Sequence, residues 1–258
     1  MIDLTTAAKM AIQLMDLTSL NLQDTPEDIR KLCESAKTPY GSPAALCVYP
    51  EHVVWARYQC QQLGLKTVKI ATVTNFPGGY DAAERAADET ERAVFAGADE
   101  VDVVFPYQQY LAGNEKLARE LIQSCKARCG QRATLKVILE TGVLQQPSVI
   151  RSASLLAIEA GADFIKTSTG KVVVNATLEA AREMLTAIAD TGGHCGFKAA
   201  GGVRTAADAQ SYLQLAEDIV GRDFLAPATF RFGASGLLVN LQSMLDGTTS
   251  SNQSGTSY

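Results

Sequence analysis

The sequence has few of the residues on which metal sites and disulfide scaffolds depend. It contains only two histidines, His52 and His194, which are far apart and lack the close ligand spacing of a zinc site. Its six cysteines form no CxxC pair and are too sparse in 258 residues for a disulfide framework. We therefore expect buried free thiols, no metal and a mechanism that does not depend on one.

Long apolar runs and an excess of positive charge are also absent. No stretch of 18 apolar residues occurs, and the N-terminus lacks the basic and apolar segments of a signal peptide. The formal net charge is -5, and Lys and Arg are scattered along the chain, which disfavours nucleic acid and anionic membranes as partners. These absences predict a cytoplasmic protein in which any anionic ligand needs a local site.

Short β-rich runs alternate regularly with amphipathic helical stretches. Several runs are continuously apolar, as at residues 101–105, which suits strands buried on both faces of a parallel sheet. The predicted strands cover residues 14–18, 45–49, 68–74, 100–105, 135–141, 163–167, 196–200 and 230–235. This alternation is typical of an α/β protein with a parallel sheet.

A repeated sequence segment supports the count of strands. The segment AGAD at residues 96–99 returns at residues 160–163, and in each copy the glycine is suited to end a helix in a left-handed turn. Two units of about 32 residues explain this spacing, and eight such units fill a chain of this length. We predict a single (β/α)8 TIM barrel over residues 1–246, with a doubly wound open sheet as the alternative, and a flexible polar C-terminal tail over residues 247–258.

Two lysines are expected to meet inside the barrel. Alternation sends Ile165 and Phe197 toward the outer helices, so Lys166 and Lys198 point inward from neighbouring strands. Two charges roughly 5 Å apart, at an effective dielectric of about 20, repel by about 3 kcal/mol, or about two pKa units. A lysine must lose its proton to attack a carbonyl, so we predict Lys166 as the nucleophile. An isolated lysine would more often reach solvent or pair with a carboxylate.

The same alternation places two further charged side chains inside the barrel. Lys136 points inward from residues 135–139 and is expected to pair with Asp102 or Glu140. The apolar neighbours of Asp102 put its carboxylate beside the lysines, where it would transfer protons or hold Lys136 or Lys198 in a salt bridge.

Three glycine-containing loops follow the late strands of the predicted barrel. Barrels commonly hold phosphate with the loops after strands 7 and 8, where backbone N–H groups and helix N-termini face the anion. Any one of these segments taken singly is also consistent with a tight turn. Together they predict a phosphate site, and its candidate segments are residues 169–171, 201–204 and 233–236.

Several motifs resemble those of class I deoxyribose-phosphate aldolases, and the resemblance runs through nearly the whole chain. FIKTSTGK, within GADFIKTSTGK at residue 161, is especially specific. The other matching segments are LMDLTSL at 14, TVTNFP at 72, ADEVDVVFPY at 98, LKVILETG at 135, GFKAAGGVRT at 196 and RFGAS at 231.

The resemblance implies a barrel that reversibly cleaves 2-deoxy-D-ribose 5-phosphate into acetaldehyde and D-glyceraldehyde 3-phosphate, as a homodimer without metal or organic cofactor. It implies that Lys166 forms the imine, Lys198 lowers the pKa of Lys166, Asp102 relays protons and the tail delivers Tyr258 for proton exchange. The substrate-binding residues predicted from the loops and the resemblance are Asp16, Thr18, Lys136, Thr169, Gly170, Lys171, Gly201, Gly202, Ser235 and Gly236.

The sequence departs from the close branch of that family at two positions. Ala199 stands where Pro is expected, and Gly236 stands where a second Ser is expected, which removes one hydroxyl from the phosphate loop. Two other functions remain open from the residues alone. One is a different Schiff-base barrel aldolase or a transaldolase, and the other is a non-catalytic barrel that senses a phosphorylated sugar.

Overall fold

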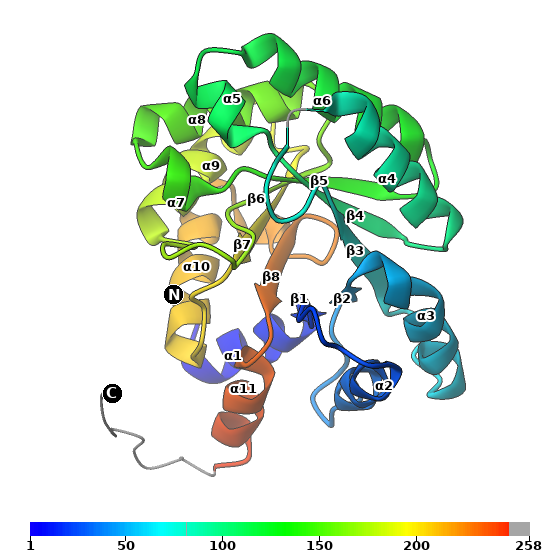
Figure 1. The fold of residues 1–258 in the computed structure, drawn as a ribbon. Helices are drawn as coiled ribbons and strands as arrows, with labels where there is room; N and C mark the ends of the chain where they lie inside the picture. Colours follow the sequence, from blue (N-terminus) through cyan, green and yellow to red (C-terminus); the bar gives the residue numbers. More distant parts are fainter. Residues whose placement is uncertain (81, 248–258) are drawn as a thin grey trace, which may run out of the picture.

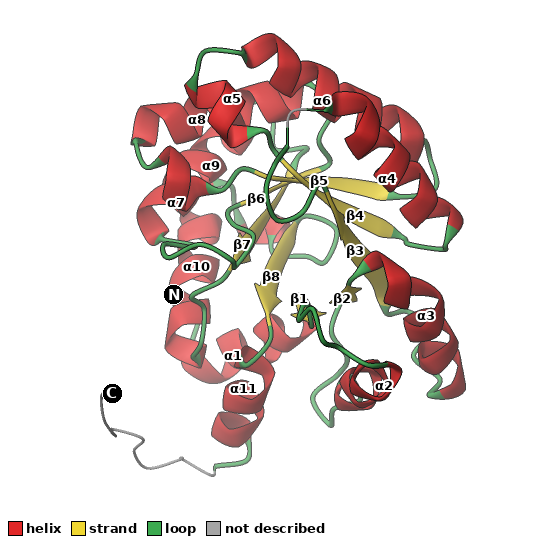
Figure 2. Cartoon of the chain, viewed as in Figure 1, coloured by secondary structure: helices red, strands yellow, loops and turns green. Residues whose placement is uncertain are grey.

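Eight parallel strands close into a barrel in chain order (Figure 2). The computed structural model describes residues 1–80 and 82–247. The strands are β1 (Met15–Thr18), β2 (Ala45–Val48), β3 (Lys69–Thr74), β4 (Glu100–Val104), β5 (Thr134–Ile138), β6 (Phe164–Lys166), β7 (Gly196–Ala200) and β8 (Phe230–Ala234). β8 pairs with β1, so the sheet is closed and the predicted (β/α)8 TIM barrel is confirmed over the open sheet. The predicted tail lies outside the described residues from residue 248 onward.

Helices surround the barrel (Figure 1). Several begin at side-chain caps, such as α2, where Thr25 and Asp28 form a capping box and Pro26 occupies the first turn. Short 3-10 helices cover Pro50–His52 and Arg222–Phe224. The α-helices are α1 (Leu4–Gln13), α2 (Pro26–Ser35), α3 (Val53–Gln62), α4 (Ala83–Phe95), α5 (Tyr107–Leu111), α6 (Glu115–Cys129), α7 (Thr141–Leu144), α8 (Pro147–Glu159), α9 (Leu178–Asp190), α10 (Ala206–Ile219) and α11 (Leu237–Leu245).

The main apolar core lies between the strands and the surrounding helices. Ile165 and Phe197 are fully buried in this core, as their predicted outward direction requires. Their neighbours Lys166 and Lys198 are paired in register on β6 and β7. The inside of the barrel therefore receives the charged side chains, and the apolar side chains hold the helices to the sheet.

The repeated AGAD segment has the same structural role in both copies. Gly97 and Gly161 have φ values of 98° and 104° and follow the ends of α4 and α8, which confirms the predicted helix-terminating turn. The aspartate of each copy accepts a backbone N–H from the preceding strand at 2.8 Å: Asp99 from Ile70, and Asp163 from Leu135. The repeated segment thus marks equivalent junctions, and at each one an aspartate binds one strand to the next.

The structure differs from the predicted strands most clearly after β5. The expected strand continued to residue 141, but β5 ends at Ile138 and Thr141 begins α7. Glu140 has a φ of 58°, and its carboxylate accepts the Thr169 hydroxyl at 2.5 Å. The left-handed backbone at Glu140 ends the strand, and its hydrogen bond to Thr169 is a tertiary contact that local sequence does not reveal. Among the described residues, no helix has the length and apolar character needed to cross a membrane.

Candidate active site

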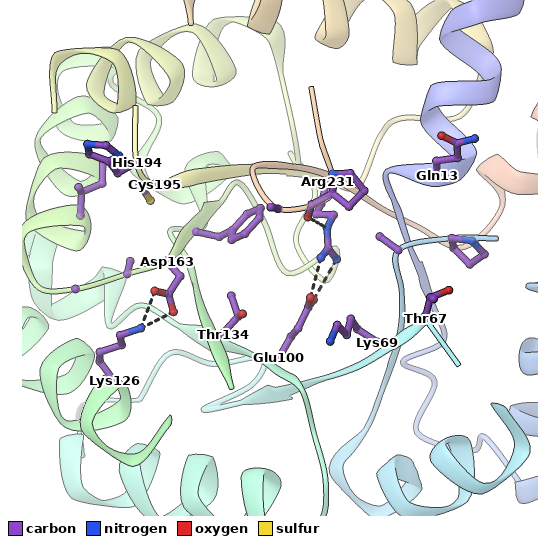
Figure 3. A pocket seen from close by; sticks show the side chains of 18 of the residues that line it. Gln13, Thr67, Lys69, Glu100, Lys126, Thr134, Asp163, His194, Cys195 and Arg231 are labelled. Atoms are coloured by element: carbon purple, nitrogen blue, oxygen red, sulfur yellow. Dashed lines mark hydrogen bonds and ion pairs between the residues drawn. The ribbon is translucent and has the colours of Figure 1, made fainter. Parts of the chain in front are cut away.

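Two cavities lie at opposite ends of the barrel. The larger, of about 1020 Å³, is lined by the first residues of several strands, including Lys69 and Glu100 (Figure 3). The smaller, of about 610 Å³, lies at the carboxyl ends of the strands, where TIM-barrel active sites are found. We take the smaller cavity as the candidate active site because Lys166 and all three glycine loops line it. The predicted residues in its wall are Thr18, Lys166, Thr169, Gly170, Lys171, Gly201, Gly202, Ser235 and Gly236.

Lys166 and Lys198 share one carboxylate oxygen. The Nζ atom of each lysine lies 2.8 Å from Oδ2 of Asp102, so the two nitrogens are separated by no more than twice this distance. Lys198 also donates to Asp16. Both amines are therefore inside the barrel and close to each other, as strand alternation predicted.

The surroundings of the two lysines move their pKa values in opposite directions. Burial has the largest influence on Lys166 and lowers its pKa; Asp102 acts against this, and the charge of Lys198 lowers the pKa further. Burial also acts to lower the pKa of Lys198, but the nearby charges of Asp102 and Asp16 outweigh it and raise that pKa. Lys166 is therefore the lysine that more readily supplies a neutral amine.

Asp102 also binds the third inward lysine. Lys136 lies 2.9 Å from Oδ1 of Asp102 and 2.5 Å from Glu100, and its expected pairing with Asp102 is confirmed. Glu140 instead binds Thr169. Burial acts to raise the pKa of Asp102, but the three lysines outweigh it and hold that pKa well below its usual range. Asp102 is therefore an anion that bridges three amines.

Asp16 and Lys136 lie beneath the cavity and not in its wall. Both side chains are fully buried and separated by 3.5 Å. Asp16 also pairs with Arg231, which lies 2.7 Å from Glu100. The positive charges of Lys198, Arg231 and Lys136 lower the pKa of Asp16 in spite of its burial. The structure thus places Asp16 and Lys136 where they act on the site through charge.

The glycine loops have backbone conformations suited to an anion. Gly201 and Gly202 follow β7 with φ values of 75° and 87°. Gly236 caps α11 without a side-chain hydrogen bond, whereas Thr205 and Asp208 form a capping box on α10. The N-terminus of α11 is therefore the better placed of these two helix ends to receive a phosphate.

Side chains on the rim connect the loops across the cavity. The Lys171 ammonium donates to the backbone oxygen of Leu20 at 2.6 Å, which joins the loop after β6 to the loop after β1. The Thr18 hydroxyl donates to the backbone oxygen of Asp16 at 2.8 Å. Thr18 and Lys171 line the same cavity as Lys166.

Sequence reasoning missed several residues of this site. Glu100 and Arg231 had no assigned partners, although Glu100 shares the strand face of Asp102 and Arg231 is in register with Lys198. Asn21 and Asn175 line the cavity from loops whose course strand periodicity does not predict, and Arg204 lines it from the predicted segment 201–204 without having been given a role. Within residues 1–80 and 82–247, no group of three or more His, Cys, Asp or Glu side chains is arranged to hold a metal ion. Tyr258, which was predicted to be catalytic, lies outside the described residues.

Comparisons with known proteins agree with this geometry. A protein from Coccidioides immitis, assigned as a deoxyribose-phosphate aldolase, is 30% identical over 92% of this chain and 86% of its own, with a TM-score of 0.78. The tetrameric deoxyribose phosphate aldolase from Aeropyrum pernix is 26% identical over 94% of this chain and 92% of its own, with a TM-score of 0.74. A Toxoplasma gondii structure, 24% identical over 95% of this chain and 96% of its own, shares the fold with a TM-score of 0.85. Residues 10–243 match the DeoC/LacD family aldolases, and the chain belongs to this family.

Proposed function

We propose that this aldolase reversibly cleaves 2-deoxy-D-ribose 5-phosphate into acetaldehyde and D-glyceraldehyde 3-phosphate through a Schiff base on Lys166. The observation that carries the proposal is the position of one amine. Of the three inward lysines on β5, β6 and β7, Lys166 is the one that lines the cavity, and its pKa is lowered. A buried amine with a lowered pKa at the end of a barrel strand is suited to attack a carbonyl.

In the synthetic direction, the neutral amine of Lys166 attacks the carbonyl carbon of acetaldehyde and forms a carbinolamine. Loss of water gives a protonated imine, whose positive nitrogen acidifies the adjacent methyl group. Loss of a methyl proton, assisted by Asp102 with water or by Tyr258, leaves an enamine. The enamine carbon attacks the aldehyde carbon of D-glyceraldehyde 3-phosphate, and the aldehyde oxygen takes up the proton lost by the methyl group and becomes a hydroxyl. Hydrolysis of the new imine then releases the sugar and restores the amine.

The roles of the lysines and Asp102 follow from their contacts. Lys198 stays protonated beside Asp102 and Asp16, so it opposes a positive charge on Lys166 before the reaction begins. Asp102 is a weak base because three lysines stabilise its anion. It is therefore suited to relay a proton through water and to stabilise the positive imine, and less suited to hold the proton itself.

The glycine loops would bind the phosphate of the acceptor aldehyde. Backbone N–H groups around Gly201 and Gly202, the start of α11 and the Lys171 ammonium offer donors on one side of the cavity. These contacts are remote from the bond that forms, so their binding energy would orient the acceptor and reduce the entropic part of the barrier.

A Schiff-base aldolase for a different sugar phosphate would use the same amine and loops, so the donor must be tested directly. The protein is incubated with acetaldehyde, reduced with borohydride and digested, and the modified peptide is identified by mass spectrometry. We expect one ethyl group on Lys166. Lys166→Leu should abolish both the label and the cleavage of 2-deoxy-D-ribose 5-phosphate, and Lys9→Leu on the exposed face of α1 should change neither. Label spread equally over surface lysines, or cleavage retained by Lys166→Leu, would contradict the proposal.

We also infer a cytoplasmic location and a homodimer, the first from the composition of the chain and the second from the family resemblance. The Aeropyrum pernix relative is a tetramer. Light scattering after size-exclusion chromatography measures the molar mass in solution and distinguishes these assemblies.

A further inference from the structure

A continuous chain of buried ion pairs runs through the barrel between the two cavities. Each of its side chains is in contact with at least one member of opposite charge, and each residue is at most 4% exposed. Three members are carboxylates and four are basic groups. We call these residues the barrel cluster: Asp16, Glu100, Asp102, Lys136, Lys166, Lys198 and Arg231.

The cluster is electrically balanced when one of its four basic groups is neutral. Arg231 keeps its charge at all ordinary pH values and pairs with two carboxylates. Lys136 contacts three carboxylates and Lys198 contacts two, whereas Lys166 contacts only Asp102. Because a net charge is costly inside a protein, the proton is most easily lost from Lys166.

Three other titratable groups lie around the cavity end of the cluster, and two of them, Cys47 and Glu140, interact with Lys166 through charge without an ion pair. Cys47 on β2 is fully buried, and burial raises the pKa of its thiol. Glu140, whose pKa burial also raises, is hydrogen-bonded to Thr169. Lys171 donates to the backbone oxygen of Leu20 at the rim. Within the described part of the chain, none of the three forms an ion pair with the cluster.

We propose that Glu100 and Arg231 are positioning residues for the reaction, because they fix the charge count of the barrel cluster and so keep Lys166 in its amine form. Both residues line the larger cavity at the amino ends of the strands, opposite the substrate, and Figure 3 shows their paired contact there. They act on Lys166 through Asp16, Lys136, Lys198 and Asp102. This inference rests on the proposed Schiff-base function of Lys166.

Paired substitutions test the charge count. Arg231→Met leaves the cluster with one excess negative charge, so Lys166 retains its proton to higher pH. Glu100→Gln has the opposite effect. For a unit charge acting over about 10 Å at an effective dielectric of about 20, each substitution should shift the pH midpoint of trapping by on the order of one unit. At a pH below the midpoint, this shift changes the trapping rate by about tenfold. The readout is the pH midpoint of acetaldehyde trapping on Lys166 by cyanoborohydride, followed by mass spectrometry.

Two further variants separate charge from structure. The double variant Glu100→Gln/Arg231→Met restores the balance, so its midpoint should return to that of the wild type. Arg231→Lys keeps the charge and should leave the midpoint unchanged even where it lowers stability. If Arg231→Met does not fold, the Glu100→Gln and double variants decide the question.

The outcomes also distinguish this inference from the function on which it rests. The role of Glu100 and Arg231 would be overturned if the pH midpoints did not move, or if they moved in the same direction in both single variants. In that case, label on Lys166 of the wild-type protein would still support the proposed function. A wild-type protein without label on Lys166 would remove the proposed function itself.

Discussion

At the scale of single residues, Lys198 is the nearest positive charge that acts on Lys166, because both bind the same oxygen of Asp102. We predict that Lys198→Met raises the pKa of Lys166 and slows acetaldehyde trapping by about 100-fold at pH 7. The loss should shrink as the pH rises, because deprotonation then proceeds without help from Lys198. The pH profile of the trapping rate measures this effect. Lys198→Arg keeps the positive charge and is the matched control, and a pH-independent loss in Lys198→Met would point to a purely structural role.

Gly236 offers a second test at the residue scale. Its φ is -94°, and a Cβ atom built on it meets no atom within 4 Å, so serine fits without strain. We predict that Gly236→Ser adds a hydrogen bond to the phosphate and lowers the KM for D-glyceraldehyde 3-phosphate by about tenfold. The KM for unphosphorylated D-glyceraldehyde should stay unchanged. An equal change for both aldehydes would show that position 236 does not face the phosphate.

At the scale of elements, the loop after β7 depends on a close approach. Gly201 has a φ of 75°, and a Cβ atom there would lie 2.7 Å from the side chain of Asn175. We predict that Gly201→Ala destabilises the protein by about 2 kcal/mol or more and weakens phosphate binding, because the two loops must separate. Gly221→Ala is the matched control, since Gly221 also has a positive φ but its Cβ would meet no atom within 4 Å. Urea unfolding and the KM for the phosphorylated acceptor should separate the two variants.

Asp163 tests the junction that the repeated segment forms. Its carboxylate accepts a hydrogen bond from the backbone N–H of Leu135, which is fully buried. Asp163→Ala therefore leaves that N–H donor without its partner. We predict a loss of about 1–3 kcal/mol in the free energy of unfolding. Asp163→Asn keeps an acceptor and loses only the partly exposed ion pair with Lys126, so it should cost less. Urea denaturation measures both, and equal losses would show that the ion pair matters more than the backbone hydrogen bond.

The elements also show how far sequence reasoning reaches. Alternation around Ile165 and Phe197 was enough to place Lys166 and Lys198 inside the barrel, because both strands are buried on their outer side. The end of β5 could not be predicted, since Glu140 turns to bind Thr169, 29 residues away. The ion pair of Arg231 could not be predicted either, because its partner Glu100 is 131 residues away in the sequence and lies across the barrel. Periodicity predicts the side of a strand, but not which charges meet once the barrel has closed.

At the scale of the whole molecule, the barrel joins an apolar shell to a charged interior. The shell of helices and outward strand residues supplies the apolar burial that holds the fold together. The carboxylates of the barrel cluster inside it are paired with the charged side chains of Lys136, Lys198 and Arg231. The proposed reaction also requires that Lys166 be neutral. A neutral buried lysine carries a cost for the fold as a whole, because the unfolded chain binds that proton freely.

This cost predicts that removal of the proposed nucleophile stabilises the protein. The folded pKa of Lys166 is lowered, so between that pKa and the unfolded value of about 10.4 the unfolded state binds more protons and wild-type stability rises with pH. Lys166→Met should therefore increase the free energy of unfolding by about 2 kcal/mol at pH 7, and this gain should shrink toward pH 10. Lys198→Met should instead destabilise the protein, since it leaves Asp16 and Asp102 with fewer partners. Urea unfolding at several pH values measures both, and a loss of stability in Lys166→Met at pH 7 would mean that Lys166 is a charged member of the barrel cluster and not its neutral amine.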